Sequence, residues 1–196
     1  MKNKLLVGLG ILAAIILLGI FWYVGMYNSL IKLNEEVNGK WAQVETQYQR
    51  RVDLIPNLVS TVKGAANFEQ STLEDITKLR SQWQSAPTVE QKVQSANQLE
   101  SAISKLLVIA ENYPQLTATQ NFQSLQDELA NTENKISVER GRYNEAVKTF
   151  NARIKTFPSS IVAGKLGYAD KTYFNAEAGA EKAPKVMFGA SLKSPR

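Results

Sequence analysis

LLVGLGILAAIILLGIFWYVGM, residues Leu5–Met26, contains no charged side chain and is apolar almost throughout. As a helix it would rise about 1.5 Å per residue and span roughly 33 Å, close to the ~30 Å hydrocarbon core of a bilayer. Phe21, Trp22 and Tyr23 stand together near its C-terminal end, and amphipathic rings of this kind favour the headgroup region. The run predicts a transmembrane helix at residues 5–26, preceded by a short basic N-terminus at residues 1–4.

A cleaved signal peptide is the alternative, because it also combines a basic start with an apolar run. Two features favour a retained anchor. The run is longer than the apolar segment of a usual signal peptide, and residues 21–26 offer no pair of small residues at the spacing that a signal peptidase needs. The chain contains no cysteine, which also excludes a lipidated signal.

The orientation of this anchor is predicted from the charges on its two sides. Lys2 and Lys4 make the N-terminal side wholly positive, whereas positive and negative residues cancel over residues 32–40. The positive-inside rule therefore favours a cytoplasmic N-terminus and an extracytoplasmic body at the inner membrane.

Composition excludes more functions than it suggests. The net charge is +5, and without Lys2 and Lys4 the body keeps 21 basic and 18 acidic residues, a surplus of +3 that is spread along the chain. Such a surplus favours solubility rather than nucleic-acid binding. The absence of cysteine removes disulfides and thiol catalysis, and the absence of histidine removes the commonest metal ligand and general base.

An apolar stripe follows the anchor at steps of three and four residues, which places its members on one face of a long helix. They are Leu30, Leu33, Val37, Trp41, Val44, Tyr48, Val52, Ile55, Leu58, Val62 and Ala66. Nothing between Met26 and Leu30 forces a break, so the anchor is expected to continue into this helix.

Pro56 interrupts the stripe. Proline removes one backbone donor, but the periodicity continues past it, so a kink is expected rather than an end. Asp53 lies one turn from both Arg50 and Asn57 and could pair with either. A recognition site for a partner at this bend is possible in principle, but a packed kink with a solvated ion pair is the favoured interpretation.

Further helices are predicted at residues 71–84 and 88–111, either as two helices or as one jointed helix. Capping boxes at Ser71-x-x-Glu74 and Thr88-x-x-Gln91 open them, and a third at Thr117-x-x-Gln120 opens the next helix. That helix has the most regular pattern, with a mean step of about 3.5 residues, which is typical of a left-handed bundle or coiled coil. Its stripe comprises Phe122, Leu125, Leu129, Thr132, Ile136, Arg140, Tyr143, Val147, Phe150, Ile154 and Phe157.

Arg140 is the one charged member of this stripe. It could pair with a buried carboxylate or mark a ligand site, although a long side chain that reaches water at the edge of the stripe is the commoner case. Phe157-Pro158 ends the helical part. The glycines and scattered aromatics of residues 159–196 predict an extended tail that packs on the bundle, or alternatively a docking peptide for a partner.

Several motifs follow one another along nearly the whole chain. They are Tyr27-Asn28, Trp41, RRVDLIPNLV at residues 50–59, Val62-Lys63-Gly64, ENYPQL at residues 111–116, Asn121-Phe122, Leu125-Gln126, Leu129, Thr132-Glu133-Asn134, Arg142-Tyr143-Asn144, Tyr173-Phe174, Ala183-Pro184-Lys185-Val186 and Phe188. In this order they resemble the LemA family of bacterial membrane proteins. The chain departs from the family at Ala65-Ala66-Asn67-Phe68, where an aromatic residue and a histidine are usual.

The resemblance implies an all-α fold, with an N-terminal transmembrane helix and an up-and-down antiparallel bundle of the four-helix type. The expected boundaries are a bundle at residues 27–158 and the extended tail at residues 159–196. It implies no reaction, because the family has no established activity.

No motif in the sequence supplies chemistry. Without histidine a Glu-x-x-His metal bundle cannot form, and Glu128, Glu133 and Glu139 are expected on solvated faces. No nucleophile elbow, P-loop or dinucleotide fingerprint occurs, and no lysine stands out as part of a Ser–Lys dyad. No catalytic, cofactor-binding or metal-binding residue is therefore assigned, no cofactor is expected, and the protein is not expected to be an enzyme.

One basic patch is a candidate nucleic-acid site, but no nucleic acid is expected as a partner, because Glu139 and Glu145 interleave with the patch and an exported body would not meet DNA. It comprises Arg140, Arg142, Lys148, Arg153 and Lys155. The favoured function is a membrane-anchored adaptor or assembly scaffold, with the lipid bilayer and other membrane or envelope proteins as partners. A self-assembling structural protein, and so a homo-oligomer, is the alternative, and an envelope hydrolase is a distant one.

Overall fold

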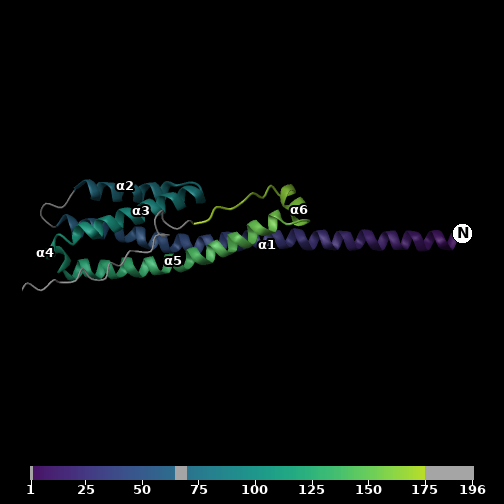
Figure 1. Ribbon diagram of the computed structural model, residues 1–196, viewed down its shortest axis with the longest axis horizontal. Coiled ribbons are helices and arrows are strands. Elements are labelled where there is room, and N and C mark those ends of the chain that lie inside the picture. The colour runs from purple at the N-terminus through teal and green to yellow at the C-terminus, as the bar shows by residue number, and fades with distance from the viewer. Residues whose placement is uncertain (1, 65–69, 175–196) are drawn as a thin grey trace, which may run out of the picture.

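The computed structural model describes residues 2–64 and 70–174, and these residues form helices and their connections (Figure 1). The motifs predicted at residues 65–68, 183–186 and 188 lie outside the described residues. The helices are α1 (Lys2–Lys63), α2 (Gln70–Ser85), α3 (Val89–Ala110), α4 (Pro114–Thr117), α5 (Gln120–Lys155) and α6 (Ser159–Lys165). The all-α prediction is confirmed.

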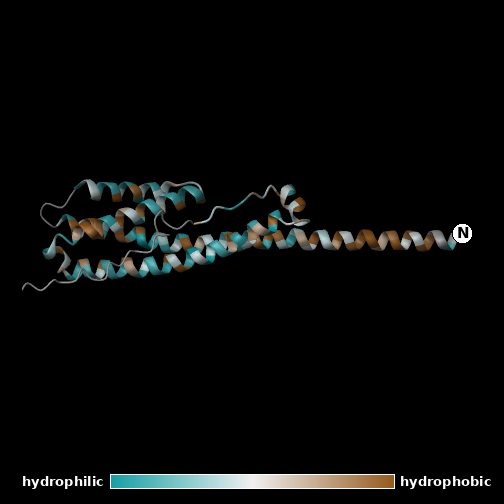
Figure 2. Ribbon diagram, viewed as in Figure 1, coloured by the Kyte–Doolittle hydropathy of each residue, from teal (hydrophilic) through white to brown (hydrophobic). Residues whose placement is uncertain are grey.

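Helix α1 joins the apolar run and the first bundle helix in one unbroken element of 62 residues. Its N-terminal part projects alone from the bundle, and no residue of its most apolar segment is buried (Figure 2). Among the described residues, this is the one helix long and apolar enough to cross a membrane. Pro56 lies inside α1, so the expectation that the helix continues past it is confirmed.

The bundle consists of two antiparallel helix pairs. Helix α5 packs along the C-terminal part of α1 and runs in the opposite direction, a pair that we call the α1–α5 hairpin although its helices are not consecutive. Helices α2 and α3 form a second, shorter antiparallel pair beside it (Figure 1). Residues 71–84 and 88–111 therefore belong to two helices rather than one. Most members of the predicted stripes of α1 and α5 are buried between the helices, from Leu30 to Val62 and from Phe122 to Ile154. Phe157, the last predicted member, is instead 76% exposed and lies beyond the end of α5.

One of the predicted caps is confirmed. The Thr88 side chain is the N-cap of α3 and accepts a hydrogen bond from the backbone N–H of Gln91. Helix α2 instead begins at Gln70, one residue before the predicted cap at Ser71.

The cap predicted at Thr117 is wrong. Pro114 occupies the first turn of α4, where its fixed φ and missing N–H are favourable, and Thr117 is the last residue of that one-turn helix. Helix α5 is capped by Thr119, whose hydroxyl oxygen accepts from the backbone N–H of Phe122.

The C-terminal region was expected to be extended from residue 159, but its first seven residues form α6. The Ser159 hydroxyl donates to the carbonyl of Arg153, which ties the start of α6 to the end of α5. Gly167, at φ 68°, ends the helix in the left-handed conformation that glycine adopts readily. Residues 166–174, the docked segment, then lead back along the bundle, as the prediction of a packed tail requires.

Candidate functional site

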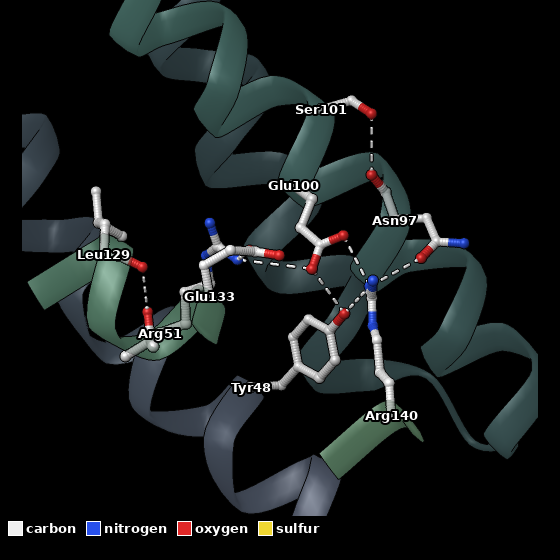
Figure 3. Close-up of polar contacts among 9 residues, drawn as sticks. Tyr48, Arg51, Asn97, Glu100, Ser101, Leu129, Glu133 and Arg140 are labelled. Carbon is white, nitrogen blue, oxygen red and sulfur yellow. Dashed lines mark hydrogen bonds and ion pairs between the residues drawn. The ribbon is translucent and has the colours of Figure 1, made fainter. Parts of the chain in front are cut away.

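Six polar side chains from three helices meet inside the bundle (Figure 3). We call this group the polar cluster. Its members are Tyr48 and Arg51 of α1, Asn97 and Glu100 of α3, and Glu133 and Arg140 of α5. It links the α1–α5 hairpin to α3.

Glu100 is the centre of the polar cluster, with a side chain only 7% exposed. Its Oε1 accepts a hydrogen bond from the Tyr48 hydroxyl at 2.9 Å, and its Oε2 accepts from Arg140 Nη2 at 2.7 Å. The same Arg140 nitrogen donates to the Tyr48 oxygen and, at 3.1 Å, to Asn97 Oδ1. Both carboxylate oxygens are therefore bonded, which is what a buried charge requires.

Arg51 forms the second half of the polar cluster. Its side chain is 6% exposed, and its Nη1 lies 3.6 Å from Glu100 Oε1 and forms an ion pair with Glu133. Two arginines and two glutamates thus give the group no net charge. Removing Glu100 would leave Arg140 without its counter-ion, and Arg51 would keep only the half-exposed Glu133.

An aromatic wall closes one side of the polar cluster. Phe174, at the end of the docked segment, stacks on the rings of Trp41 and Tyr48 at 5.9 and 6.3 Å and meets Tyr143 edge-on at 5.6 Å. The guanidinium carbon of Arg140 lies 4.9 Å from the centre of the Phe174 ring, within the range of a cation–π contact. The C-terminal segment therefore completes the surroundings of Arg140.

Two asparagines of α5 hold the docked segment by its backbone. Asn144 donates to the carbonyl of Phe174 and accepts from its N–H, both at 2.9 Å. Asn151 pairs in the same way with Lys171, at 2.9 and 2.8 Å. The asparagines lie seven residues apart, about two helical turns, so both amides face the same side of α5. Tyr143 adds a hydrogen bond from its hydroxyl to the carbonyl of Thr172 at 3.0 Å.

Burial governs the titration of these groups. Burial and the nearby charge of Glu100 raise the pKa of Tyr48 far above its usual range, although Arg140 opposes the shift. Burial also raises the pKa of Tyr143, to about 12. Burial raises the pKa of Glu100, with Arg140 acting in the opposite direction. Both phenols therefore stay protonated at neutral pH and serve as hydrogen-bond donors.

A cavity of about 800 Å³ lies elsewhere, at the end of the bundle farthest from the projecting part of α1. Its lining combines polar and apolar groups without a charged side chain, and it includes most of the ENYPQL motif. The lining residues are Ser60, Thr61, Gly64, Asn112, Tyr113, Pro114, Gln115, Leu116, Thr119 and Asn121. No member of the polar cluster reaches this cavity.

The arrangement has the properties of a structural core rather than a reaction centre. The inner members of the polar cluster are largely closed off from solvent, and Arg51 Nη1 and Arg140 Nη2 both face the carboxylate of Glu100. The Nε atoms of the two arginines are buried without a hydrogen-bond partner. Over residues 2–64 and 70–174, no group of three or more acidic side chains is placed to hold a metal ion.

The structure decides between the alternatives for Arg140, which pairs with a buried carboxylate. It does not bring the basic patch together. Arg142 pairs with Glu139, Lys148 with Glu145 and Lys155 with Asp170, while Arg140 points into the core. The expected solvated faces for Glu133 and Glu139 are corrected. The half-exposed Glu133 pairs with Arg51, and the Glu139 side chain is only 16% exposed. Asp53 accepts from Gln49 at 2.7 Å rather than from the partners considered.

The sequence did not single out Glu100, Asn97 or the two asparagines that bind the backbone of the docked segment, Asn144 and Asn151, which we call the asparagine clamps. Glu100 directly follows Leu99, an apolar residue of α3. The apolar periodicity places Leu99 on the buried face and predicts a solvent-facing position for the charged residue beside it. The spacing of Asn144 and Asn151 was a readable signal, because it places two short amides on one helix face beside the buried stripe.

Comparison with known proteins gives a consistent picture. The model of the LemA family matches residues 40–188. A protein named LemA from Metamycoplasma hominis is 29% identical over 169 residues, which cover 85% of this chain and 77% of that protein. Magnetosome protein MamQ 1 from Paramagnetospirillum magneticum and magnetosome protein MamQ from Magnetospirillum gryphiswaldense are each 22% identical and cover 76% of this chain. The match covers 64% of each magnetosome protein, so this chain spans less than two thirds of their length.

Proposed function

This chain belongs to the LemA family, and from that premise we propose that it is a single-pass membrane protein whose helical bundle acts as a non-catalytic adaptor or assembly scaffold. The observation that carries the proposal is the continuity of α1. One helix supplies both a segment with the length and composition of a membrane span and the central stripe of the bundle core.

This continuity sets the reach of the bundle. From Met26 to Val62 the helix rises about 54 Å at 1.5 Å per residue. The far end, with its polar cavity, therefore stands roughly 50 Å from the headgroup region. Such a rod suits a protein that presents a binding surface at a set height. The two magnetosome relatives carry names that refer to a cellular structure rather than to a reaction.

The charge difference across the anchor supports an extracytoplasmic bundle at the inner membrane. The expected partners are other membrane or envelope proteins. The polar cluster supports a structural role for the core, because its charged side chains pair with one another across three helices and the Glu100 carboxylate at its centre is buried.

The test is photo-crosslinking in intact membranes. A photoreactive residue replaces Gln115 at the far-end cavity, and a control carries it at Lys148, an exposed position in the C-terminal third of α5. The proposal expects a defined set of proteins crosslinked from position 115 and recovered through a tag on this chain. A protein that crosslinks to nothing at any exposed position would contradict it, and crosslinks only between two copies would favour the self-assembling alternative.

A further inference from the structure

The end of the bundle nearest the apolar segment is formed by the turn between α5 and α6. Helix α5 runs antiparallel to α1, so its C-terminal residue Lys155 lies at the end where α1 leaves the bundle (Figure 1). Helix α6 lies beside α1 at the same place. Met26, only 7% exposed, is the first buried residue of α1 in the described chain. It stands three residues beyond Tyr23, a rise of about 4.5 Å. The bundle therefore begins where the headgroup region is expected.

This turn exposes large apolar side chains. Phe157 is 76% exposed and Ile161 is 56% exposed, whereas their neighbours Val162 and Ala163 are buried in the bundle. Val162 and Ala163, together with the buried Ser159, attach α6 to the rest of the bundle. Phe157 and Ile161 instead leave more than half of their surface uncovered by the described part of the chain.

Basic residues lie four positions before Phe157 and four positions after Ile161 in the sequence. Arg153 and Lys165 are exposed on either side of the turn, in the last turns of α5 and α6. Lys155 is also exposed and pairs with Asp170 at 2.7 Å. Apolar side chains flanked by cations have the chemistry of a surface that rests on a bilayer, since the apolar groups enter the interface and the cations reach lipid phosphates.

We propose that Phe157 and Ile161, flanked by Arg153 and Lys165, form a second membrane contact, which we call the corner, and that its occupant is the same bilayer that α1 crosses. The inference rests on the proposed anchoring. Its independent support is position, because the corner is continuous with the place where α1 would leave the lipid. A single helix leaves its bundle free to tilt and rotate above the membrane. A second contact about one bundle width away fixes both the tilt and the rotation.

The chain lacks cysteine, so single-cysteine variants of the full-length protein can be spin-labelled without background. Ile161→Cys reports the corner. Val108→Cys is the matched control, an exposed apolar residue of α3 near the far end of the bundle. Leu12→Cys reports the anchor itself. Each labelled protein is placed in nanodiscs at one copy per disc, and collisions of the label with oxygen and with a water-soluble nickel chelate are measured by electron paramagnetic resonance.

The proposal expects the label at position 161 to collide with the nickel chelate several-fold less than the label at position 108, and more with oxygen. Equal accessibility at positions 161 and 108, with position 12 still in lipid, overturns the corner and leaves the anchoring intact. A label at position 12 that is open to the chelate overturns the anchoring itself. Protection of position 161 only when several copies share one disc would assign the surface to a second chain and overturn the lipid contact.

The charged part of the proposal is tested by lipid composition. Arg153→Glu and Lys165→Glu, introduced together with Ile161→Cys, should raise the exposure of the label in discs containing phosphatidylglycerol and change it little in phosphatidylcholine. An equal effect in both lipids would overturn the role of the cations. Phe157→Ser should raise exposure in both lipids, and an unchanged label would overturn the insertion of the aromatic ring.

Discussion

Two parts of the bundle core hold the helices together in different ways. One is the polar cluster, and the other is the set of buried apolar side chains on the same helices, which we call the apolar seam. The seam, with Leu58 and Val62 on α1 and Phe122 on α5, buries side chains whose attraction is non-directional. The polar cluster bonds Tyr48 and Glu100 through particular atoms at particular distances. We infer that the seam supplies most of the stability and that the polar cluster sets the register between the α1–α5 hairpin and α3.

The largest effect is expected from breaking the polar cluster at its centre. Glu100→Ala leaves Arg140 buried without its counter-ion and deprives Arg51 of one of two acidic partners, and removing one member of a buried pair typically costs about 3–5 kcal/mol. Urea-induced unfolding of the detergent-solubilised chain measures the loss. A change below about 1 kcal/mol would show that water reaches the arginines freely, and the polar cluster would then resemble a surface ion pair.

A control variant that removes three charged side chains together tests whether the loss of stability comes from the unpaired buried charge. Arg51→Met, Glu100→Leu and Arg140→Met in one chain should cost much less than Glu100→Ala, because no buried charge is left unpaired. The one charge that loses its partner is Glu133, whose side chain is 43% exposed to water. Leu106→Ala in the apolar part of α3 should cost about 2–5 kcal/mol, with no rescue from any second substitution in the polar cluster.

The next effect is expected where the docked segment closes the polar cluster. Phe174→Ala removes an almost fully buried ring, and we expect a loss of about 3 kcal/mol, at the lower end for such a truncation because the segment can detach. Proteolysis provides a second measurement, since the variant should be cut between residues 167 and 174 faster than the parent. An unchanged cleavage rate would contradict the conclusion that the Phe174 ring holds the docked segment on the bundle.

The asparagine clamps should have a smaller effect. Asn144→Ala leaves the N–H and the carbonyl of Phe174 without their partners, and we expect a loss of about 1–3 kcal/mol. Hydrogen exchange at the amide of Phe174 should accelerate, while the amide of Lys171, held by Asn151, should change less. The matched control is Lys148→Ala, which removes an exposed ion pair and should cost at most about 0.5 kcal/mol. Equal losses in the two variants would contradict the clamp.

The smallest effect is expected from pH. The pKa of Tyr48 is raised in the folded chain above the value of about 10 that holds when it is unfolded. The stability that its protonated hydroxyl contributes is therefore fully present below pH ~10 and is lost as the pH rises toward the folded pKa. Tyr48→Phe should weaken the fall in stability above pH ~10, measured by unfolding at several pH values. The remaining fall reports Tyr143 among other groups. An identical pH dependence in parent and variant would contradict the assignment.

Features that depend on residues close in sequence could be predicted, whereas contacts between residues far apart in sequence could not. Periodicity predicted the helices and nearly every buried position of the stripes on α1 and α5, since burial repeats with the helical turn. The predicted N-cap of α5 was two residues too early, because the one-turn helix that begins at Pro114 includes Thr117 and leaves Thr119 as the cap. Arg140 was singled out as an anomaly, but its partner was not identified.

The sequence by itself determined the long continuous first helix with its apolar end, the all-α class and the absence of histidine and cysteine chemistry, because these depend on local composition and period. Only the tertiary structure decided that Glu100 meets Arg140 and that Phe174 closes their site. Those contacts join residues 40 and 34 positions apart. No local pattern encodes them, because they depend on how the two hairpins lie against each other and where the docked segment returns.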